Sequence, residues 1–396
     1  MNQPLRVALK LDLRWPLKRH AHIFAGTQRY ADEHGWESII DEYADEHLSD
    51  ASVKSPPFDG VIARVNAKLA NGCRRLALPL VNVWFNSPAK DDFPGVFPDM
   101  TAVGRLRAEH LLSRGLRRFA VLTSEDDAEK VAAESFRTTI AAVDGKCLRE
   151  KIPLDPSRTF AAWQRTEQRI EAWMERWQLP IGVSIASEEV GRMVIQICRH
   201  RGWRVPGDVA IIAGTNEDVL CDHPRPSLTS VEIGYERIGY QAARLLDEQM
   251  RSPNKRRGAR NQPPRHMLVP PHGLIVREST DFYAVDDEVV TQALRFIAAN
   301  SHRHINVDDV ARAAGLHPRT LQRRIRQVVD WPIADEIRRV RIERAKRELA
   351  ESKRSMAEIA RDVGFGDRKR MYDVFRREVG ITPAAYRKQR RLESPF

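Results

Sequence analysis

Long apolar runs and paired cysteines are both missing from this sequence. The N-terminal segment MNQPLRVALKLDLRWPLKR is interrupted by Lys10 and Asp12, so it is too short and too charged for a secretion signal or a membrane span. No other stretch reaches the length that a bilayer requires. The four cysteines are scattered and form no C-x-x-C pair, which fits neither a disulfide framework nor a common zinc site. We therefore expect a cytoplasmic protein.

The short motifs of common enzyme classes are missing as well. The sequence contains no P-loop, no G-x-S-x-G and no H-E-x-x-H. His302, His304 and His317 could be pictured as a metal cluster, but residues two apart do not share a helical face. The sequence thus predicts no enzyme activity, no cofactor and no metal site.

What the first two thirds of the chain do contain is an alternation of strands and helices. Apolar segments such as RVALKL, GVIARV and RFAVLT alternate with amphipathic ones such as TAVGRLRAEHLLSRG. This order is typical of parallel sheets covered by helices on both faces. With 396 residues, of which 42% are hydrophobic and 30% charged, the chain is long enough for two or three domains. We predict an α/β architecture from about residue 5 to 279.

The last quarter holds the same helix-turn-helix pattern twice, in INVDDVARAAGLHPRTLQRRIRQVV and SMAEIARDVGFGDRKRMYDVFRREVG. Each copy begins with a capping residue and an acid three positions later, Asn306 with Asp309 and Ser355 with Glu358. A glycine that permits a left-handed turn ends the first helix of each copy. Residues 334–352 have the apolar spacing of one long helix. We predict a rigid connection between two similar units.

Positive charge is concentrated in this same region. Residues 287–396 hold 25 Lys and Arg against 16 Asp and Glu, a balance of +9, whereas the whole chain holds 65 against 54, or +11. The first 286 residues therefore carry only +2. A basic balance confined to one small domain is typical of a nucleic-acid partner.

Closed by GITPAAYR, the tandem pattern resembles the DNA-binding domain of AraC-family transcription regulators. In that family the second helix of each unit enters a major groove of double-stranded DNA, and the two grooves are about 34 Å apart on one face of the duplex. Arginine fits guanine bidentately and glutamine fits adenine. The resemblance assigns DNA contacts to Arg319, Thr320, Gln322, Arg323, Arg368, Lys369, Tyr372 and Asp373, with Arg326 and Arg376 expected on phosphate.

The upstream segments VFPDMTAVGRLRAEHLLSRGLRRFAVL, RGWRVPGDVAIIAGTNED and RPSLTSVEIGYERIGYQAARLL resemble the sensor domains of LacI-type repressors, which have the two-lobed periplasmic-binding-protein fold. This combination closely resembles the xylose regulators of the AraC family. The resemblance implies a sensor over residues 1–279, with lobe one at 1–123 and 227–265 and lobe two at 124–226 and 266–279. A linker at 280–286 and a DNA-binding domain at 287–396 follow. It also favours a homodimer.

A ligand of such a sensor is expected at the carboxyl ends of the strands. Carboxylates and amides bind sugar hydroxyls, and an aromatic ring stacks on the sugar's C–H face. The residues that follow the predicted strands give the candidates Asp12, Trp15, Trp84, Asn86, Asp99, Ser187, Glu188, Thr215 and Asn216.

Two pairs of these candidates depart from the family. Relatives typically carry Asn-Asp or Thr-Asp where this chain has Ser187-Glu188, and Asp-Asn where it has Thr215-Asn216. The missing Asp removes an acceptor for hydroxyls and puts xylose in doubt. We predict a DNA-binding regulator that responds to a sugar-like small molecule. A regulator with a vestigial or altered cleft is the alternative, and a soluble solute-binding protein would leave the tandem units unexplained.

Overall fold

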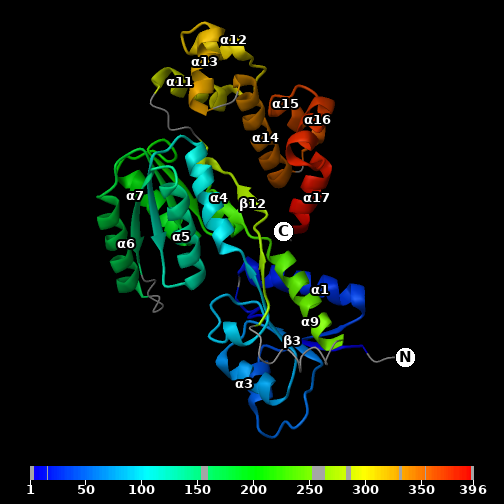
Figure 1. Ribbon diagram of the computed structural model, residues 1–396. Helices are drawn as coiled ribbons and strands as arrows, with labels where there is room; N and C mark the ends of the chain where they lie inside the picture. Colours follow the sequence, from blue (N-terminus) through cyan, green and yellow to red (C-terminus); the bar gives the residue numbers. More distant parts are fainter. Residues whose placement is uncertain are drawn as a thin grey trace. The chain divides into compact units, whose positions relative to one another are not determined.

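In the computed structural model, which describes residues 4–15, 17–152, 159–251, 264–281, 287–329, 332–352 and 354–393, the chain divides into two units. The first comprises Met1–His110 and Arg118–Ser279, and the second comprises Leu111–Arg117 and Thr280–Phe396. In the first unit, two parallel sheets are each flanked by helices, whereas the second unit is helical (Figure 1). None of the helices in the described part of the chain combines the length and the apolar character needed to cross a bilayer.

Lobe one is built on a six-stranded parallel sheet in the order β11-β5-β4-β3-β1-β2. Its strands are β1 (Arg6–Lys10), β2 (Glu37–Ile40), β3 (Gly60–Ala63), β4 (Leu80–Asn82), β5 (Gly95–Pro98) and β11 (His266–Val269). Its helices are α1 (Lys18–His34), α2 (Ala44–Ser49), α3 (Ala67–Arg75) and α9 (Tyr235–Arg251), with a 3-10 turn at Lys90–Asp92.

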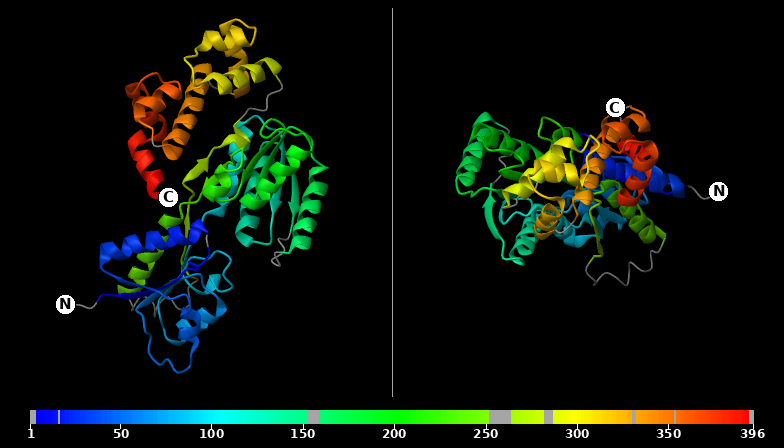
Figure 2. Two further views of the ribbon diagram at one scale, coloured as in Figure 1. Left: turned by 180° about the vertical axis from the view of Figure 1, so that it is seen from behind. Right: turned by 90° about the horizontal axis from the view of Figure 1, so that it is seen from above.

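Side chains of lobe one alternate between two cores, as the period of a strand requires. Val7 and Leu9 of β1 belong to the core that α1 and α9 cover, whereas Ala8 belongs to the core under α2 and α3. Helices α1 (blue) and α9 (green) lie against each other in both views (Figure 2). A Cβ on Gly26 would stand 1.8 Å from the carbonyl oxygen of Glu236, so this close approach requires a glycine.

Lobe two is built on a four-stranded parallel sheet in the order β7-β6-β8-β9. Its strands are β6 (Arg118–Thr123), β7 (Lys146–Lys151), β8 (Ile181–Ile185) and β9 (Val209–Ala213). Its helices are α4 (Met100–Ser113), α5 (Asp127–Ala141), α6 (Phe160–Met174), α7 (Glu188–His200) and α8 (Asp218–Asp222), and α4 packs on α5. A separate antiparallel pair, β10 (Ser230–Glu232) with β12 (Gly273–Ile275), is followed by a 3-10 turn at Glu278–Thr280.

Two strands lie in the other lobe from the one that the sequence predicted. The strand β6, assigned to lobe one by the boundary at residue 123, is a central strand of the lobe-two sheet. The strand β11, assigned to lobe two, pairs in parallel with β5 of lobe one. The error on β11 arose because its partner β5 lies far earlier in the chain, where no local pattern reveals the pairing. The strand β6 instead pairs with β7, the next strand along the chain, so the predicted boundary was placed after β6 rather than before it. Of the predicted linker, residues 282–286 lie outside the described part.

The second unit contains α11 (Glu288–Asn300), α12 (Val307–Ala313), α13 (Pro318–Val329), α14 (Ile333–Glu351), α15 (Met356–Asp362), α16 (Arg368–Val379) and α17 (Pro383–Glu393). Both predicted capping boxes are present, at Asn306 and at Ser355. Gly315 and Gly364 have φ values of +66° and +90°, so the predicted left-handed turns are confirmed as well.

Candidate functional site

Helices α13 and α16, the predicted recognition helices, each bury one face and expose the other. Leu321 and Ile325 of α13 are fully buried, as are Met371 and Phe375 of α16, because residues four apart lie on the same side of a helix. The residues predicted to contact DNA occupy the remaining surface. Arg319, Arg323, Arg326, Arg368, Lys369, Tyr372, Asp373 and Arg376 are exposed, while Thr320 and Gln322 are half-buried.

The cations of the recognition surface differ from many other exposed cations of the unit in having no acidic partner. Within the described ranges, none of Arg319, Arg323, Arg326, Arg368, Lys369 and Arg376 forms an ion pair. By contrast, Arg312 of α12 lies 3.3 Å from Asp309, and Arg338 of α14 lies 2.9 Å from Asp335. The unpaired cations are therefore concentrated on the two helices.

Helix α14 connects the two helix-turn-helix units and belongs to both of their cores. Ile337 and Val340 pack in the core of the first helix-turn-helix unit, whereas Ile342 and Leu349 pack in the core of the second helix-turn-helix unit. The buried Arg341 donates hydrogen bonds to the carbonyl oxygens of Ser301 and Arg303, each at 2.9 Å. The predicted long helix at residues 334–352 is present, and these bonds fix it to the first helix-turn-helix unit.

In lobe two, Glu188 turns inward to the protein backbone. One of its carboxylate oxygens accepts the N–H groups of Thr215 at 2.7 Å and Glu217 at 3.1 Å. Its side chain is buried, and this burial raises the pKa of the carboxyl although the N–H groups act in the opposite direction. A Cβ on Gly214 (φ +67°) would stand 2.1 Å from both carboxylate oxygens. Glu188 therefore holds the loop after β9 and does not present its carboxylate as an open acceptor.

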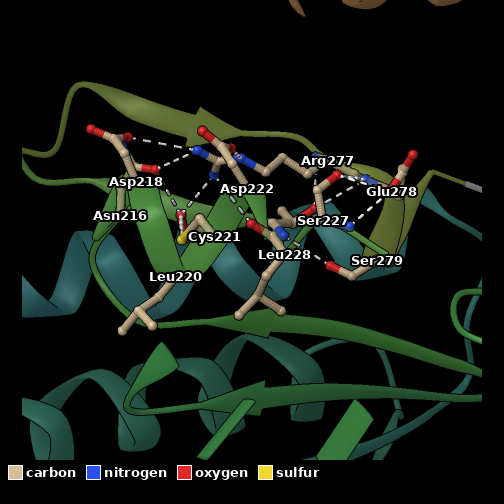
Figure 3. A network of polar contacts seen from close by, with 12 residues as sticks. Asn216, Asp218, Leu220, Cys221, Asp222, Ser227, Leu228, Arg277, Glu278 and Ser279 are labelled. Carbon is tan, nitrogen blue, oxygen red and sulfur yellow. Dashed lines mark hydrogen bonds and ion pairs between the residues drawn. The ribbon is translucent and has the colours of Figure 1, made fainter. Parts of the chain in front are cut away.

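Asn216 is fully buried and both ends of its side-chain amide are occupied. Its Nδ2 donates to Glu232 at 2.8 Å, and its Oδ1 accepts from Arg277 at 2.8 Å and Ser230 at 3.2 Å. Arg277 lies at the centre of this network and also pairs with Asp222 at 2.7 Å (Figure 3). Asn216 would therefore have to exchange these internal bonds in order to contact a ligand.

Thr215, where relatives are expected to carry an Asp, is also engaged in an internal bond. Its backbone N–H donates to a carboxylate oxygen of Glu188 at 2.7 Å. An acidic side chain at position 215 would stand beside Glu188 and Glu217, so it would be repelled by two carboxylates.

Three further candidates form local or inter-lobe hydrogen bonds. Asp99 accepts the N–H of Ala102 at 2.9 Å at the start of α4, and Ser187 caps α7 by accepting the N–H of Val190 at 3.3 Å. Asn86 of lobe one donates to Asp126 and accepts the N–H of Ala128 at 3.2 Å, both at the start of α5 in lobe two. Ser187 also lines a small pocket with mostly apolar walls at the ends of β6 and β8.

The remaining candidates lie at the carboxyl end of the lobe-one sheet. Asp12 lies 3.5 Å from Lys10 and 3.3 Å from Arg64, so its carboxylate is shared by two cations. The ring of Trp84 is covered by Arg64, whose guanidinium carbon is 5.0 Å from the ring centroid. Trp15 is 54% exposed. Of the predicted stacking residues, Trp84 thus already stacks on a cation, and Trp15 keeps an exposed ring.

Sequence reasoning missed the basic residues that surround this end of the sheet. Lys18, Arg19 and His20 form the first turn of α1, and Arg64 follows the end of β3 directly. The Nζ of Lys18 lies 3.0 Å from both Asp218 and Glu232, so lobe one is tied to lobe two through these pairs. Burial tends to lower the pKa of Lys18, but the two carboxylates outweigh it and the pKa is raised. The sequence did contain an indication of a special role for these residues, because three basic residues in the first turn of a helix face the positive end of the helix dipole.

Known families match both units. A periplasmic binding protein-like domain matches residues 108–280, and a helix-turn-helix domain matches residues 310–389. The xylose operon regulatory protein of Escherichia coli (strain K12) is 27% identical over 391 residues, or 96% of each chain. The regulatory protein SoxS of the same strain is 31% identical over 100 residues, which are 25% of this chain and 94% of SoxS.

The chain belongs to the AraC family of transcription regulators. A solved structure titled xylose-binding transcription activator xylR is similar over 98% of each chain, with a TM-score of 0.59 and 24% identity, and this likeness establishes the fold. The AraC-family chain is therefore a DNA-binding transcription regulator with a periplasmic-binding-protein-like sensor, and it is not an enzyme. The alternative of a solute-binding protein is thereby excluded.

Proposed function

We propose that α13 and α16 read bases in two adjacent major grooves of promoter DNA, while Arg326 and Arg376 contact phosphate. The observation that carries this proposal is the concentration of exposed cations without ion pairs on the two helices. An unpaired guanidinium has no bond to give up before it meets a guanine edge or a phosphate. Because α14 packs in both cores, the spacing between the two readers is set by one helix.

The test compares three substitutions in the full chain. Arg323→Ala and Arg368→Ala should each weaken binding to the cognate site by about 1–3 kcal/mol and relax base preference at one position. Arg376→Ala should weaken binding to cognate and random DNA alike. The matched control is Arg312→Ala, which removes an exposed arginine from α12 that already pairs with Asp309. Fluorescence anisotropy with cognate and random DNA gives the affinities. If each of the three variants loses as much affinity for random DNA as for cognate DNA, the base-reading residues are wrongly assigned.

For the sensor, we infer an effector that is a sugar-like small molecule. The relatives support this inference, because one is named for the xylose operon and a solved neighbour is titled xylose-binding. In this chain the groups best placed for an effector are in lobe one, where Trp15 is exposed and basic side chains surround the end of the sheet. Glu188, Thr215 and Asn216 are engaged in internal bonds, so recognition of hydroxyls would differ from that in relatives with acidic pairs at these positions.

A second candidate is a regulator that acts without an effector. The ion pairs of Lys18 with Asp218 and Glu232 favour it, since they join the lobes without any ligand. A thermal-shift screen of the full chain against pentoses, hexoses and their acidic derivatives separates the two candidates. A ligand at a hundred times its dissociation constant stabilises the native state by about 2.7 kcal/mol. A rise in the midpoint with one compound supports the sensor, and its absence across the panel supports the second candidate.

We further propose that the regulator acts as a homodimer in the cytoplasm, where promoter DNA is found. Closed two-fold assemblies are the commonest form of soluble oligomers, and a dimer would present two pairs of recognition helices. Sedimentation equilibrium measures the mass directly. The proposal requires twice the monomer mass of 45.3 kDa, and a single-chain mass at micromolar concentration would contradict it.

A further inference from the structure

We propose that the effector carries a negatively charged group, a carboxylate or a phosphate, and that Arg19 and Arg64 bind it, held side by side by His20. This inference rests on the proposed response of the sensor to a sugar-like molecule and adds the chemical class of that molecule. The expected ligand is a sugar acid or a sugar phosphate rather than a neutral sugar such as xylose.

His20 is fixed in one neutral form by its hydrogen bonds. Its Nδ1 lies 2.8 Å from the backbone carbonyl oxygen of Asp12, which can only accept, so Nδ1 carries the proton. The other ring nitrogen, Nε2, must then accept, and it receives bonds from Nη1 of Arg64 and from Nε of Arg19, the latter at 3.2 Å. The side chain of His20 is 2% exposed, and burial lowers its pKa. A neutral imidazole thus holds two guanidinium groups next to each other.

The two guanidinium groups differ in the carboxylates around them. Arg19 is exposed and forms no ion pair with any residue that the structure describes. Burial and the charge of Arg19 lower the pKa of Arg64, whereas Asp12, whose carboxylate lies 3.3 Å from Nε, raises it together with Asp126 and Glu42. Two like charges this close repel each other, and an anion between them would remove the repulsion.

The other cations near this end of the sheet already have partners. Lys18 pairs with Asp218 and Glu232, and in lobe two Arg107 pairs with Glu129 at 3.2 Å. Arg14 lies over the ring of Tyr43, with its guanidinium carbon 5.2 Å from the centroid. Lys18 and Arg107 are thus paired with carboxylates, whereas Arg19 has no ion pair among the described residues.

The surroundings of the pair suit an anion that belongs to a larger polar molecule. Arg19 is in the first turn of α1, which contains no acidic residue, and the positive end of the helix dipole adds to the attraction. Arg19 also lies near Glu217 of lobe two and Tyr235 of α9, whose pKa values are raised by burial and lowered by the charge of Arg19. A carboxylate or phosphate fits the fork of a guanidinium bidentately, whereas a hydroxyl takes only one bond.

Calorimetry on the full chain with matched pairs of compounds tests the proposal. The probes are xylose against xylonate, and glucose against gluconate and glucose 6-phosphate. At least one acidic compound should bind, with its neutral parent at least about tenfold weaker, which corresponds to about 1.4 kcal/mol. Whether gluconate or glucose 6-phosphate binds more tightly identifies the carboxylate or the phosphate as the recognised group.

The substitution Arg19→Gln should weaken the acidic compound by about tenfold to a hundredfold and leave any binding of the neutral parent unchanged. Arg19 is exposed, so this variant should fold even if Arg64→Gln does not. The matched control is Arg29→Gln, which removes the same charge from the same helix at a residue that pairs with Glu236; it should bind as the native chain does.

The possible outcomes distinguish a failure of the proposed anion site from a failure of the proposed sugar-like effector. Binding of a neutral sugar with no preference for its acidic derivative would overturn the proposed anion site and leave the sugar-like effector standing. Binding of the acid that is equally strong in Arg19→Gln and Arg29→Gln would also overturn it. Failure of the whole panel to bind would overturn both the anion site and the sugar-like effector.

Discussion

The polar side chains of the recognition helices and those at the edge of lobe two are in opposite situations. On α13 and α16, Arg323 and Arg368 are exposed and have no ion pair in the described part of the chain. In lobe two, Glu188 and Asn216 are buried and bonded to backbone N–H groups or to Arg277. A polyanion can bind the first surface without breaking existing bonds, whereas an effector that used the second would have to replace them. The comparison indicates that the side chains predicted to contact DNA are already available, whereas the polar side chains of lobe two are held by internal bonds.

The largest expected effect comes from removing the centre of the lobe-two network. Arg277→Met would remove the donor to two buried acceptors, the amide oxygen of Asn216 and the carbonyl oxygen of Leu228, as well as the ion pair with the partly exposed Asp222. Each buried acceptor left without a partner costs about 1–3 kcal/mol. Urea unfolding followed by near-ultraviolet circular dichroism should show this loss. Arg225→Met is the matched control, because Arg225 is half-exposed in its pair with Glu278 and exposed pairs contribute about 0–1 kcal/mol. Equal losses of unfolding free energy in the two variants would show that Arg277 does not hold the polar side chains of lobe two together.

A proline in α14 tests whether the DNA-binding surface acts as one body. Ile342 is buried in the core of the second helix-turn-helix unit, and a proline in a helix interior costs about 3 kcal/mol. Ile342→Pro should abolish tight binding to a full site while weak binding to a half-site remains. Ile342→Leu is the volume-conserving control. Full-site affinity that is unchanged in a folded Ile342→Pro variant would mean that α14 does not hold the readers in register.

Salt dependence separates phosphate contacts from other charges. Each phosphate contact contributes about −0.9 to the slope of log K against log salt concentration. Arg326→Ala and Arg376→Ala should each make the slope shallower by about one unit, whereas Arg312→Ala should leave it unchanged because that arginine already has an acidic partner. Titrations at four salt concentrations give the slopes. Three equal slopes would show that the two residues do not contact phosphate.

The smallest effect concerns the pH dependence of the sensor. The pKa of Glu188 is raised in the folded state, mainly by burial, so the native state holds this proton more tightly than the unfolded state does. Stability from this group is therefore lost as pH rises above its ordinary value of 4.5. Glu188→Gln removes the titration and keeps an oxygen for both N–H groups. The difference in unfolding free energy between the variant and the native chain should increasingly favour the variant from pH 4 to 7, and a difference independent of pH would contradict this.

The helical unit could be predicted from sequence because each of its features is local. The capping boxes at Asn306 and Ser355 and the turns at Gly315 and Gly364 depend on a few adjacent residues, and the structure contains all of them. The residues proposed to contact DNA are likewise on the exposed faces that helical periodicity indicated.

The sensor site was less predictable because caps and ligand-binding groups use the same residue types. Asp99 and Ser187 follow strands as ligand residues would, yet each accepts a backbone N–H at a helix start. The proximity of Arg19 and Arg64 depends on where α1 meets the lobe-one sheet, and no local pattern contains that information. The lobe assignment of β11 failed for the same reason, since its partner β5 is distant in sequence.

The central claim is that two recognition helices, held by α14, read two grooves about one helical turn apart. The most direct test is selection of binding sites from random DNA by the full chain and by its Arg323→Ala and Arg368→Ala variants. We predict two conserved half-sites centred about 10 base pairs apart, with Arg323→Ala relaxing one half and Arg368→Ala relaxing the other. A single conserved element, or relaxation of the same half by both substitutions, would contradict the account.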